Sequence, residues 1–210
     1  MSALAERWAG PRARSGSLTG FYWWAAAAIG GAMGGLLPHP LAAAAASAAA
    51  VGMLQALTLR SDLRYGAAWF GATVIAGALG FCAAVVGGLA FAEVAGGELP
   101  LLREGLAAWI GLAGLGGLLL AAAQAPLTGR RDLAWGWCFL GLLAGGVLWP
   151  IGLALGHRLG PELVLRLTEL LPQAAHTRAP IAQAVGFAAA WLLHSLPFGI
   201  VIAATSGERR

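Results

Sequence analysis

Six long apolar blocks, separated by short charged or proline-containing breaks, occupy most of this chain of 210 residues. A helix needs about 20 apolar residues to cross the hydrocarbon core of a bilayer, and each block comes close to that length. The blocks therefore predict an all-α integral membrane protein with six transmembrane helices. We expect these helices at about 20–37, 41–59, 65–92, 105–127, 134–155 and 181–205.

The composition fits lipid surroundings. Apolar residues make up 59% of the chain and charged residues only 10%. Soluble domains carry about 25% charged residues, so this chain cannot cover itself with a surface compatible with water. All 13 basic residues are Arg, and they are scattered between the apolar blocks. This distribution argues against nucleic-acid binding, which favours a basic stripe, and makes membrane lipids the expected partners.

The chain divides into a single six-helix membrane domain, residues 20–205, with a short segment on either side. Residues 1–19 contain several arginines but no compact apolar core ahead of a cleavage site, so we expect no signal peptide. We expect them to form a cytoplasmic N-terminal segment, and residues 206–210 a cytoplasmic tail.

The arginines also predict the orientation. Cytoplasmic loops carry an excess of Lys and Arg, and the six-helix arrangement places nine arginines on one side and four on the other. The larger group is Arg7, Arg12, Arg14, Arg60, Arg64, Arg130, Arg131, Arg209 and Arg210, and the smaller is Arg103, Arg158, Arg166 and Arg178. We therefore expect both termini in the cytoplasm and a bacterial inner membrane, either cytoplasmic or intracytoplasmic.

A different pattern lies between the fifth and sixth blocks. Pro161 stands where a helix would begin, and Pro172 where it would end. The apolar face consists of Leu163, Leu167, Leu170 and Leu171, and the polar face of Glu162, Arg166 and Glu169. The pattern predicts a short amphipathic helix at about 161–172 in the outer surface of the membrane, or one that caps the bundle from that side.

The two loops expected on the cytoplasmic side resemble each other. Residues 55–66 read QALTLRSDLRYG, and residues 124–136 read QAPLTGRRDLAWG. With Pro126 as one inserted residue, the two align at Gln, Ala, Leu, Thr, Arg, Asp, Leu, an aromatic residue and Gly. The match predicts an internal repeat of two-helix hairpins that start and end on the same side. Parallel repeats occur in transporters, and they suit a scaffold equally well.

The exit of the first hairpin, Gln55-x-Leu57-x-Leu59-Arg60, resembles that of loosely grouped, uncharacterised bacterial polytopic membrane proteins built from Gly/Ala-rich hairpins. The resemblance covers mainly the first two hairpins, and in the second Gly129 stands in place of the last Leu. It supports the architecture and implies no activity.

Closely spaced glycines predict tight helix packing. Gly31 and Gly35 form a G-x-x-x-G pair in the first block, and Gly114 and Gly117 lie together in the fourth. In lipid, small residues allow helix backbones to approach each other closely. These glycines therefore predict packing within the chain, with contact to a partner helix as the alternative.

Chemistry-bearing residues are scarce in the blocks. No Asp, Glu or Arg lies in the middle of any of them, which argues against an ion-coupled pump. The chain also lacks the metalloprotease, nucleophile-elbow and P-loop motifs. Cys82 and Cys138 lie in different blocks, where they suit packing rather than a disulfide or a metal site. We therefore expect no enzyme activity and no metal.

His194 is the exception, because it lies near the middle of the sixth block in the segment WLLHSLP. One interpretation is a neutral His that hydrogen-bonds to a neighbouring helix. The other is an axial ligand of a haem or a chlorophyll-type pigment. Each of the other three histidines is expected on the outer side, which disfavours a second ligand at matching depth. Pro197 is expected to kink the helix just past His194.

Gln55 and Gln124 form the remaining candidate pair, because both lie at cytoplasmic helix ends in the two repeats. Their amides are expected either to bind the backbone of neighbouring helices or to line a polar cavity.

Three functions fit these observations. The first is a non-enzymatic accessory or scaffold subunit of a larger membrane complex, for example an energy-transducing or photosynthetic one, with other subunits as partners. The second is a small-molecule binding or transport component, since six helices in about 200 residues resemble the substrate-binding subunits of vitamin uptake systems. The third is a carrier of a haem or pigment at His194.

Overall fold

The computed structural model describes residues 16–58, 63–94, 104–128, 133–170 and 178–206. Within these ranges the chain is helical apart from short turns, and it contains no strand. The all-α prediction is therefore confirmed. The arginine-rich segments that predict the orientation fall mostly outside these ranges, as do residues 1–15 and 207–210, so the predicted placement of the termini stays a prediction.

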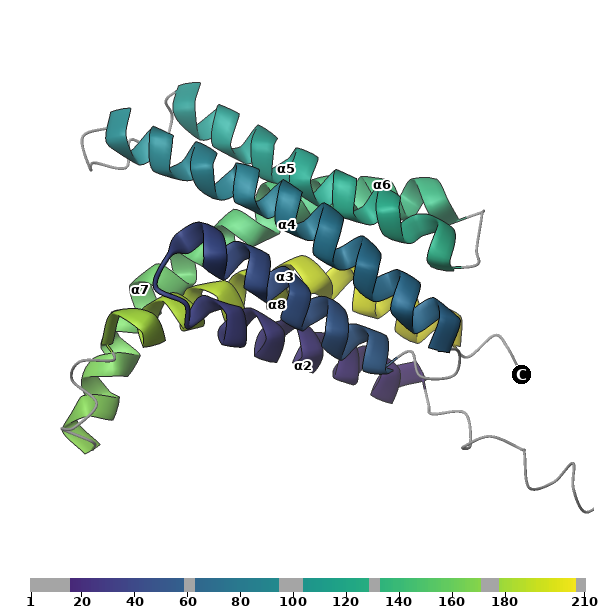
Figure 1. Ribbon diagram of the computed structural model, residues 1–210, viewed down its shortest axis with the longest axis horizontal. Helices are drawn as coiled ribbons and strands as arrows, with labels where there is room; N and C mark the ends of the chain where they lie inside the picture. Colours follow the sequence, from purple (N-terminus) through teal and green to yellow (C-terminus); the bar gives the residue numbers. More distant parts are fainter. Residues whose placement is uncertain (1–15, 59–62, 95–103, 129–132, 171–177, 207–210) are drawn as a thin grey trace, which may run out of the picture.

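The chain forms seven α-helices within the described ranges, joined in places by a 3-10 or a π turn. They are α2 (Gly16–Gly35), α3 (Pro40–Thr58), α4 (Leu63–Val94), α5 (Glu104–Gln124), the 3-10 turn η1 (Ala125–Thr128), α6 (Ala134–Leu143), the π turn η3 (Ala144–Leu148), α7 (Trp149–Leu170) and α8 (Arg178–Ser206). The helices of Figure 1 run largely along one common axis, and the last turns of α7 leave the bundle.

Five helical stretches are long and apolar enough to cross a membrane, which supports a multi-pass protein. They are Pro40–Thr58, Gly66–Gly87, Trp109–Thr128, Ala134–Arg166 and Ala179–Ala204. Helix α2, which occupies the first predicted span, is not among the five.

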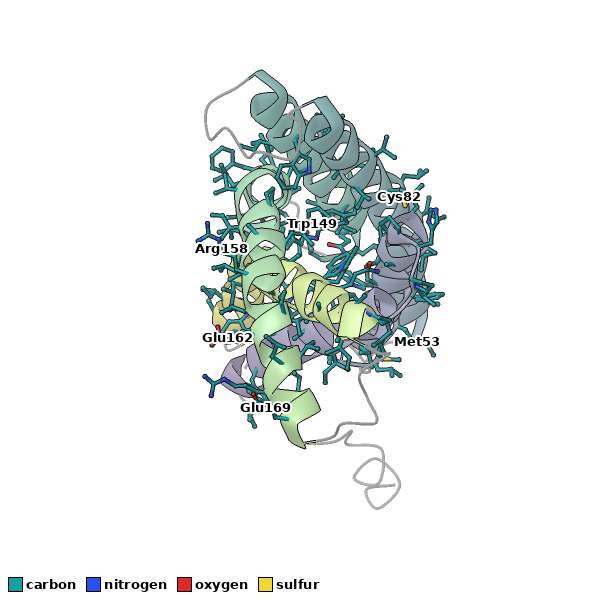
Figure 2. The ribbon with its side chains drawn as sticks, turned by 90° about the vertical axis from the view of Figure 1, so that its left-hand side faces the viewer. Met53, Cys82, Trp149, Arg158, Glu162 and Glu169 are labelled. Atoms are coloured by element: carbon teal, nitrogen blue, oxygen red, sulfur yellow. The ribbon has the colours of Figure 1, made fainter. Side chains whose placement is uncertain are left out.

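The helices are arranged in a ring, and the first closes it against the last. Contacts connect α2 to α3, α3 to α4, α4 to α5, and α5 to α6 and η3. Helix α7 then packs on α8, and α8 packs on α2. Seen from one end in Figure 2, Trp149 lies inside this ring, whereas Arg158, Glu162 and Glu169 lie at its periphery.

Glycines bring the helices of the ring into backbone contact. A Cβ added to Gly80 of α4 would lie 2.5 Å from the Cα of Gly116 on α5. Gly117 meets the backbone of Gly141 and Gly145 in the same way, so α5 also approaches α6 and η3 closely. Such approach is the main way in which helices associate tightly in lipid.

The four glycines singled out in the sequence all lie at such contacts. A Cβ on Gly31 would meet the backbone of Phe187, and one on Gly35 would lie 2.7 Å from the Cα of Ala184, both on α8. Gly114 and Gly117 face α6 and η3. Their surroundings are therefore those of packing within the chain.

The fifth predicted helix is interrupted by the π turn at Ala144–Leu148, and Pro150 explains this interruption. Proline has no N–H to donate, and its ring clashes with the carbonyl four residues earlier, here that of Gly146. A π turn avoids the clash by shifting the pattern to i→i+5, so that the N–H of Trp149 donates to the carbonyl of Ala144.

The region predicted to form a separate amphipathic helix at about 161–172 is different in the structure. Residues as far as Leu170 continue α7, and Pro161 lies inside that helix. Gly156 and Gly160 pack against the α8 backbone and hold α7 in place at this point. Pro161 is exposed, and it removes one backbone hydrogen bond of α7. The helix nevertheless continues, because its packing on α8 supports it.

Gly80 and Gly71 on α4 provide a matched test of these contacts. We expect Gly80→Ala to lower stability by about 1–3 kcal/mol, because the new methyl group overpacks the α4–α5 contact. Gly71→Ala should leave stability unchanged or raise it slightly, because an added Cβ there meets nothing within 4 Å. Thermal unfolding of both variants in mild detergent measures the difference, and equal midpoints would contradict the packing argument.

Candidate functional site around His194

His194 of α8 lies at the centre of the ring, and only 3% of its surface is exposed. Its imidazole contacts three aromatic rings: Phe81 at 5.3 Å, Phe198 at 5.4 Å and Trp191 at 5.9 Å between centroids. The imidazole also hydrogen-bonds to the backbone of Ala144 in the π turn. His194 therefore connects α8 to the discontinuity between α6 and α7.

Two aromatic layers meet at His194. On one side Phe81 stacks on Trp149 at 4.7 Å, and Trp191 meets Phe81 edge to face. On the other side Phe198 packs on Trp137 at 4.7 Å, and the layer continues to Trp69 and Trp23. These side chains come from five different helices, so the interior of the ring is largely filled by aromatic rings.

This packing bears on the pigment hypothesis. A macrocycle bound to His194 would need the space that Phe81, Trp191 and Phe198 occupy. The arrangement matches the other interpretation better, in which His194 makes a hydrogen bond to a neighbouring helix. Coordination of a haem or pigment stays a prediction that the geometry does not favour.

The two glutamines, Gln55 of α3 and Gln124 at the end of α5, meet the same segment of α4. The indole N–H of Trp69 donates to Oε1 of Gln55 at 3.3 Å. Nε2 of Gln124 donates to Oγ1 of Thr73 at 2.9 Å, and the Thr73 hydroxyl donates to the carbonyl of Trp69. Both amides are buried, so they tie three helices together in a region that offers few other polar partners.

Sequence reasoning missed two polar residues that complete the interior. The indole N–H of Trp191 donates to Oγ of Ser47 at 2.8 Å, and the Ser47 hydroxyl donates to the carbonyl of Ala44. Thr73 was missed as well. A signal was available, because Ser47 and Thr73 are isolated polar residues inside otherwise apolar blocks. Isolated residues of this kind commonly form hydrogen bonds between membrane helices.

Several buried polar atoms have no hydrogen-bond partner among the described residues. Nδ1 of His194 is one, and the indole Nε1 atoms of four tryptophans are the others, at Trp23, Trp109, Trp137 and Trp149. An unsatisfied buried polar group costs about 1–3 kcal/mol, so such atoms are rare in well-packed interiors. His194 is the one ionisable side chain among them, and it is enclosed by aromatic rings, so its surroundings are the candidate site.

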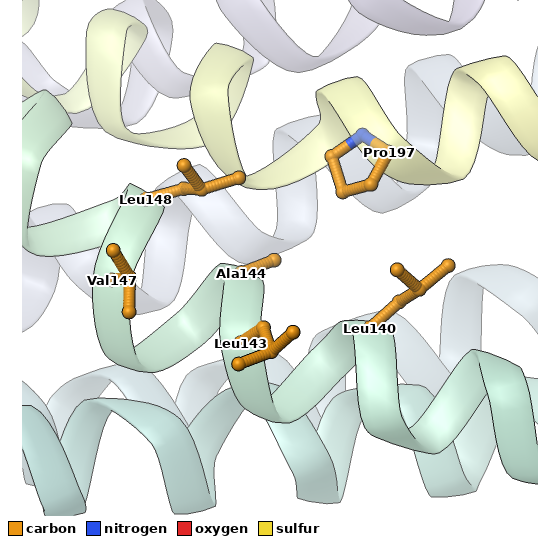
Figure 3. A pocket seen from close by; sticks show the side chains of 6 residues that line it. All are labelled: Leu140, Leu143, Ala144, Val147, Leu148 and Pro197. Atoms are coloured by element: carbon orange, nitrogen blue, oxygen red, sulfur yellow. The ribbon is translucent and has the colours of Figure 1, made fainter.

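A groove lies beside the candidate site, with α6 and η3 on one side and α8 on the other (Figure 3). It has a volume of about 320 Å³, and apolar side chains line it: Leu140, Leu143, Ala144, Val147, Leu148 and Pro197. Leu143 and Val147 are exposed, so the groove opens sideways toward the surrounding lipid. Its inner wall includes Ala144, the residue whose backbone His194 contacts.

Two helix irregularities flank this groove. The π turn that precedes Pro150 forms one side, and Pro197 of α8 forms the other. Since Pro197 has no N–H, it leaves the carbonyl of Leu193 without its usual helical partner. Irregular backbone in a membrane-spanning region is tolerated where protein or a polar cavity surrounds it, and π turns often occur at functional sites.

The described residues contain no group of three or more His, Cys, Asp or Glu that could hold a metal ion. The candidate site offers hydrogen-bonding groups in an apolar interior. The imidazole supplies one donor and one acceptor when neutral, and each indole supplies one donor.

Comparisons with protein-family models, with curated proteins and with solved structures find no match for this chain.

The hydrogen bond between Gln124 and Thr73 can be measured with a double-mutant cycle of Thr73→Val and Gln124→Leu. We expect a coupling energy of about 0.6–1.7 kcal/mol, the range found for hydrogen bonds between membrane helices. Unfolding of the single and double variants in mixed micelles gives the value. The control pair is Ser47→Ala with Gln124→Leu, which share no bond and should be additive. Equal coupling in both pairs would contradict a specific bond.

Proposed function

We propose that this protein is a non-enzymatic accessory subunit of a larger complex in a bacterial inner membrane. The observation that carries the proposal is that glycines on the two walls of the ring have different surroundings. One wall consists of α2, α3, α7 and α8, and the other of α4, α5 and α6. In α2, α3, α7 and α8, every glycine whose surroundings are described has another part of the chain within 4 Å of an added Cβ. In α4, α5 and α6, Gly71, Gly111 and Gly136 each have open space there.

Glycine inside a helix costs about 0.8–1.0 kcal/mol relative to Ala, so a glycine without a packing role is unfavourable. Gly111 and Gly136 are exposed on the outside of the ring. In lipid, such positions allow another helix to approach the backbone closely. The wall of α4, α5 and α6 therefore suits contact with helices of a partner subunit.

The interior supports a structural role as well. No charged side chain is among the buried residues of the described part of the chain. The polar interior groups of Gln55, Gln124 and Ser47 each form a hydrogen bond with a side chain of another helix. This is an interior that holds helices together, and it lacks the ionised groups of an ion path.

The proposal includes the finer topology that the sequence predicts. Six spans with both termini in the cytoplasm, built from repeated hairpins, remain the arrangement that we propose. Helix α2 then supplies the first span, and the close contact of α2 with α8 supports its position among the membrane helices.

Gentle solubilisation from native membranes, followed by mass spectrometry of co-purifying proteins, tests the proposal. We expect a stoichiometric partner, and we expect Gly111→Leu or Gly136→Leu to weaken its binding about tenfold, corresponding to ~1.4 kcal/mol. The reason is that a leucine side chain would hold the partner helix away from the backbone.

Ala42→Leu on α3 is the matched control, because Ala42 is also small and exposed but lies on the opposite wall. It should leave partner recovery unchanged. Thermal unfolding of all three variants shows whether each one folds. Recovery of the wild-type chain alone, or equal losses in the control, would argue against an accessory subunit.

A second candidate is a small-molecule binding component, and the groove beside His194 favours it. Its volume of about 320 Å³ lies at the lower end of the range of ligand pockets, about 300–1,000 Å³. This groove opens toward lipid, unlike the outer-side cavity that the likeness to vitamin uptake systems predicts.

A further inference from the structure

Helix α7 carries an uninterrupted row of exposed apolar side chains. Ile151, Leu155, Leu159 and Leu163 follow one another at intervals of four residues, and each is between 45% and 57% exposed. Residues four apart are neighbours on a helix surface, so these four form one stripe, the α7 stripe. A neighbouring side of α7 packs on α8 through its glycines. The α7 stripe is thus left on the outside of the bundle.

The helical stretch that contains the α7 stripe is longer than the hydrocarbon core of a membrane. Ala134–Arg166 has 33 residues, which corresponds to about 50 Å at a rise of about 1.5 Å per residue. The hydrocarbon core is about 30 Å thick, and membrane helices tilt by up to about 40°. Even at that tilt the stretch would cover about 38 Å along the membrane normal, so one of its ends extends beyond the hydrocarbon.

The charges indicate that the C-terminal end of α7 is the one outside the hydrocarbon. No Asp, Glu or Arg lies between Ala134 and Arg158, whereas Arg158, Glu162, Arg166 and Glu169 then follow within twelve residues, all of them exposed. A charged side chain inside hydrocarbon is costly. The last turns of α7 leave the bundle in Figure 1, and in the end-on view of Figure 2 the helix runs across the end of the bundle. Residues 158–170, the α7 arm, therefore suit the level of the lipid headgroups.

The α7 arm has an apolar side and a charged side. Leu159 and Leu163, the last two residues of the α7 stripe, lie on the apolar side. On the charged side Arg166 pairs with Glu162 at 3.5 Å, and both side chains are exposed. Two Arg and two Glu leave the α7 arm without net charge, so attraction to anionic lipids contributes little. Burial of the leucines in hydrocarbon is then the main favourable contribution.

We propose that the α7 arm lies in the plane of the membrane surface, with Leu159 and Leu163 among the lipid acyl chains and the charged side chains at the headgroups. Lipid is the partner of this surface because the α7 stripe begins at Ile151 and Leu155, within the membrane-spanning stretch, and continues to the arm without a break. An amphipathic helix in this position holds the end of a span at a fixed depth. This interaction surface goes beyond a role as an accessory subunit and does not depend on one.

Spin labels on the full chain in lipid nanodiscs test the proposal. Leu163→Cys and Leu165→Cys form a matched pair, because the two leucines are 45% and 54% exposed but lie on nearly opposite sides of the helix. Leu165 lies on the charged side, three residues after Glu162. Cys82→Ala and Cys138→Ala remove the native thiols from both variants. Power-saturation EPR then measures how often each label collides with oxygen, which is apolar, and with a nickel chelate, which is polar.

We expect the ratio of oxygen collisions to chelate collisions to be severalfold higher at position 163 than at position 165. A label introduced by Ile151→Cys, within the span, gives the reference value for lipid contact. The ratio at position 163 should be the same in nanodiscs of phosphatidylcholine and in nanodiscs with equal parts of phosphatidylglycerol, because the α7 arm has no net charge.

Equal ratios at positions 163 and 165 would overturn the proposal, since the α7 stripe would then face water. An immobilised label at position 163 that neither reagent reaches would overturn it as well, because protein would then cover the stripe. So would a ratio that rises only with phosphatidylglycerol. If Leu163→Cys does not fold, Leu159→Cys on the same stripe takes its place in the comparison.

Discussion

Backbone contact between helices at glycine is the constraint on which the rest of this structure depends. Gly80 against Gly116 and Gly117 against Gly141 set the spacing between neighbouring helices. Close spacing between neighbours closes the ring of helices from α2 to α8, and the largest side chains then fill its centre. Trp149 and Trp191 are both fully buried there. Small residues at the helix contacts and large residues inside the ring thus together give a tightly packed bundle.

The same packing decides how the polar groups are satisfied. An apolar interior supplies few hydrogen-bond partners, so each polar side chain needs one placed by a neighbouring helix. Gln124 finds Thr73, and Trp191 finds Ser47. Nδ1 of His194 and the indole N–H of Trp149 find none among the described residues. The candidate site therefore differs from the rest of the interior in containing buried polar atoms without a hydrogen-bond partner among the described residues.

The groove and the outward-facing glycines point to two different kinds of contact. The groove has α6 and η3 on one side and α8 on the other, near the places where Pro150 and Pro197 interrupt regular helical bonding. Gly71, Gly111 and Gly136 lie on α4, α5 and α6. Gly136 lies four residues before Leu140 on the same face of α6, so a partner helix at Gly136 and a small molecule in the groove would use adjacent surfaces.

The sequence by itself determined the class of the protein and the extent of most of its helices. Length and apolarity suffice for that, because the lipid requirement acts on each block separately. The sequence also identified His194, Gln55 and Gln124 as candidate site residues, because polar residues are conspicuous in apolar blocks. Only the tertiary structure decided which partners they meet: Ala144, Trp69 and Thr73 lie far from them in sequence or on other helices. It also decided that residues 161–170 continue α7, because packing of Gly156 and Gly160 on α8 outweighs the local signal of Pro161.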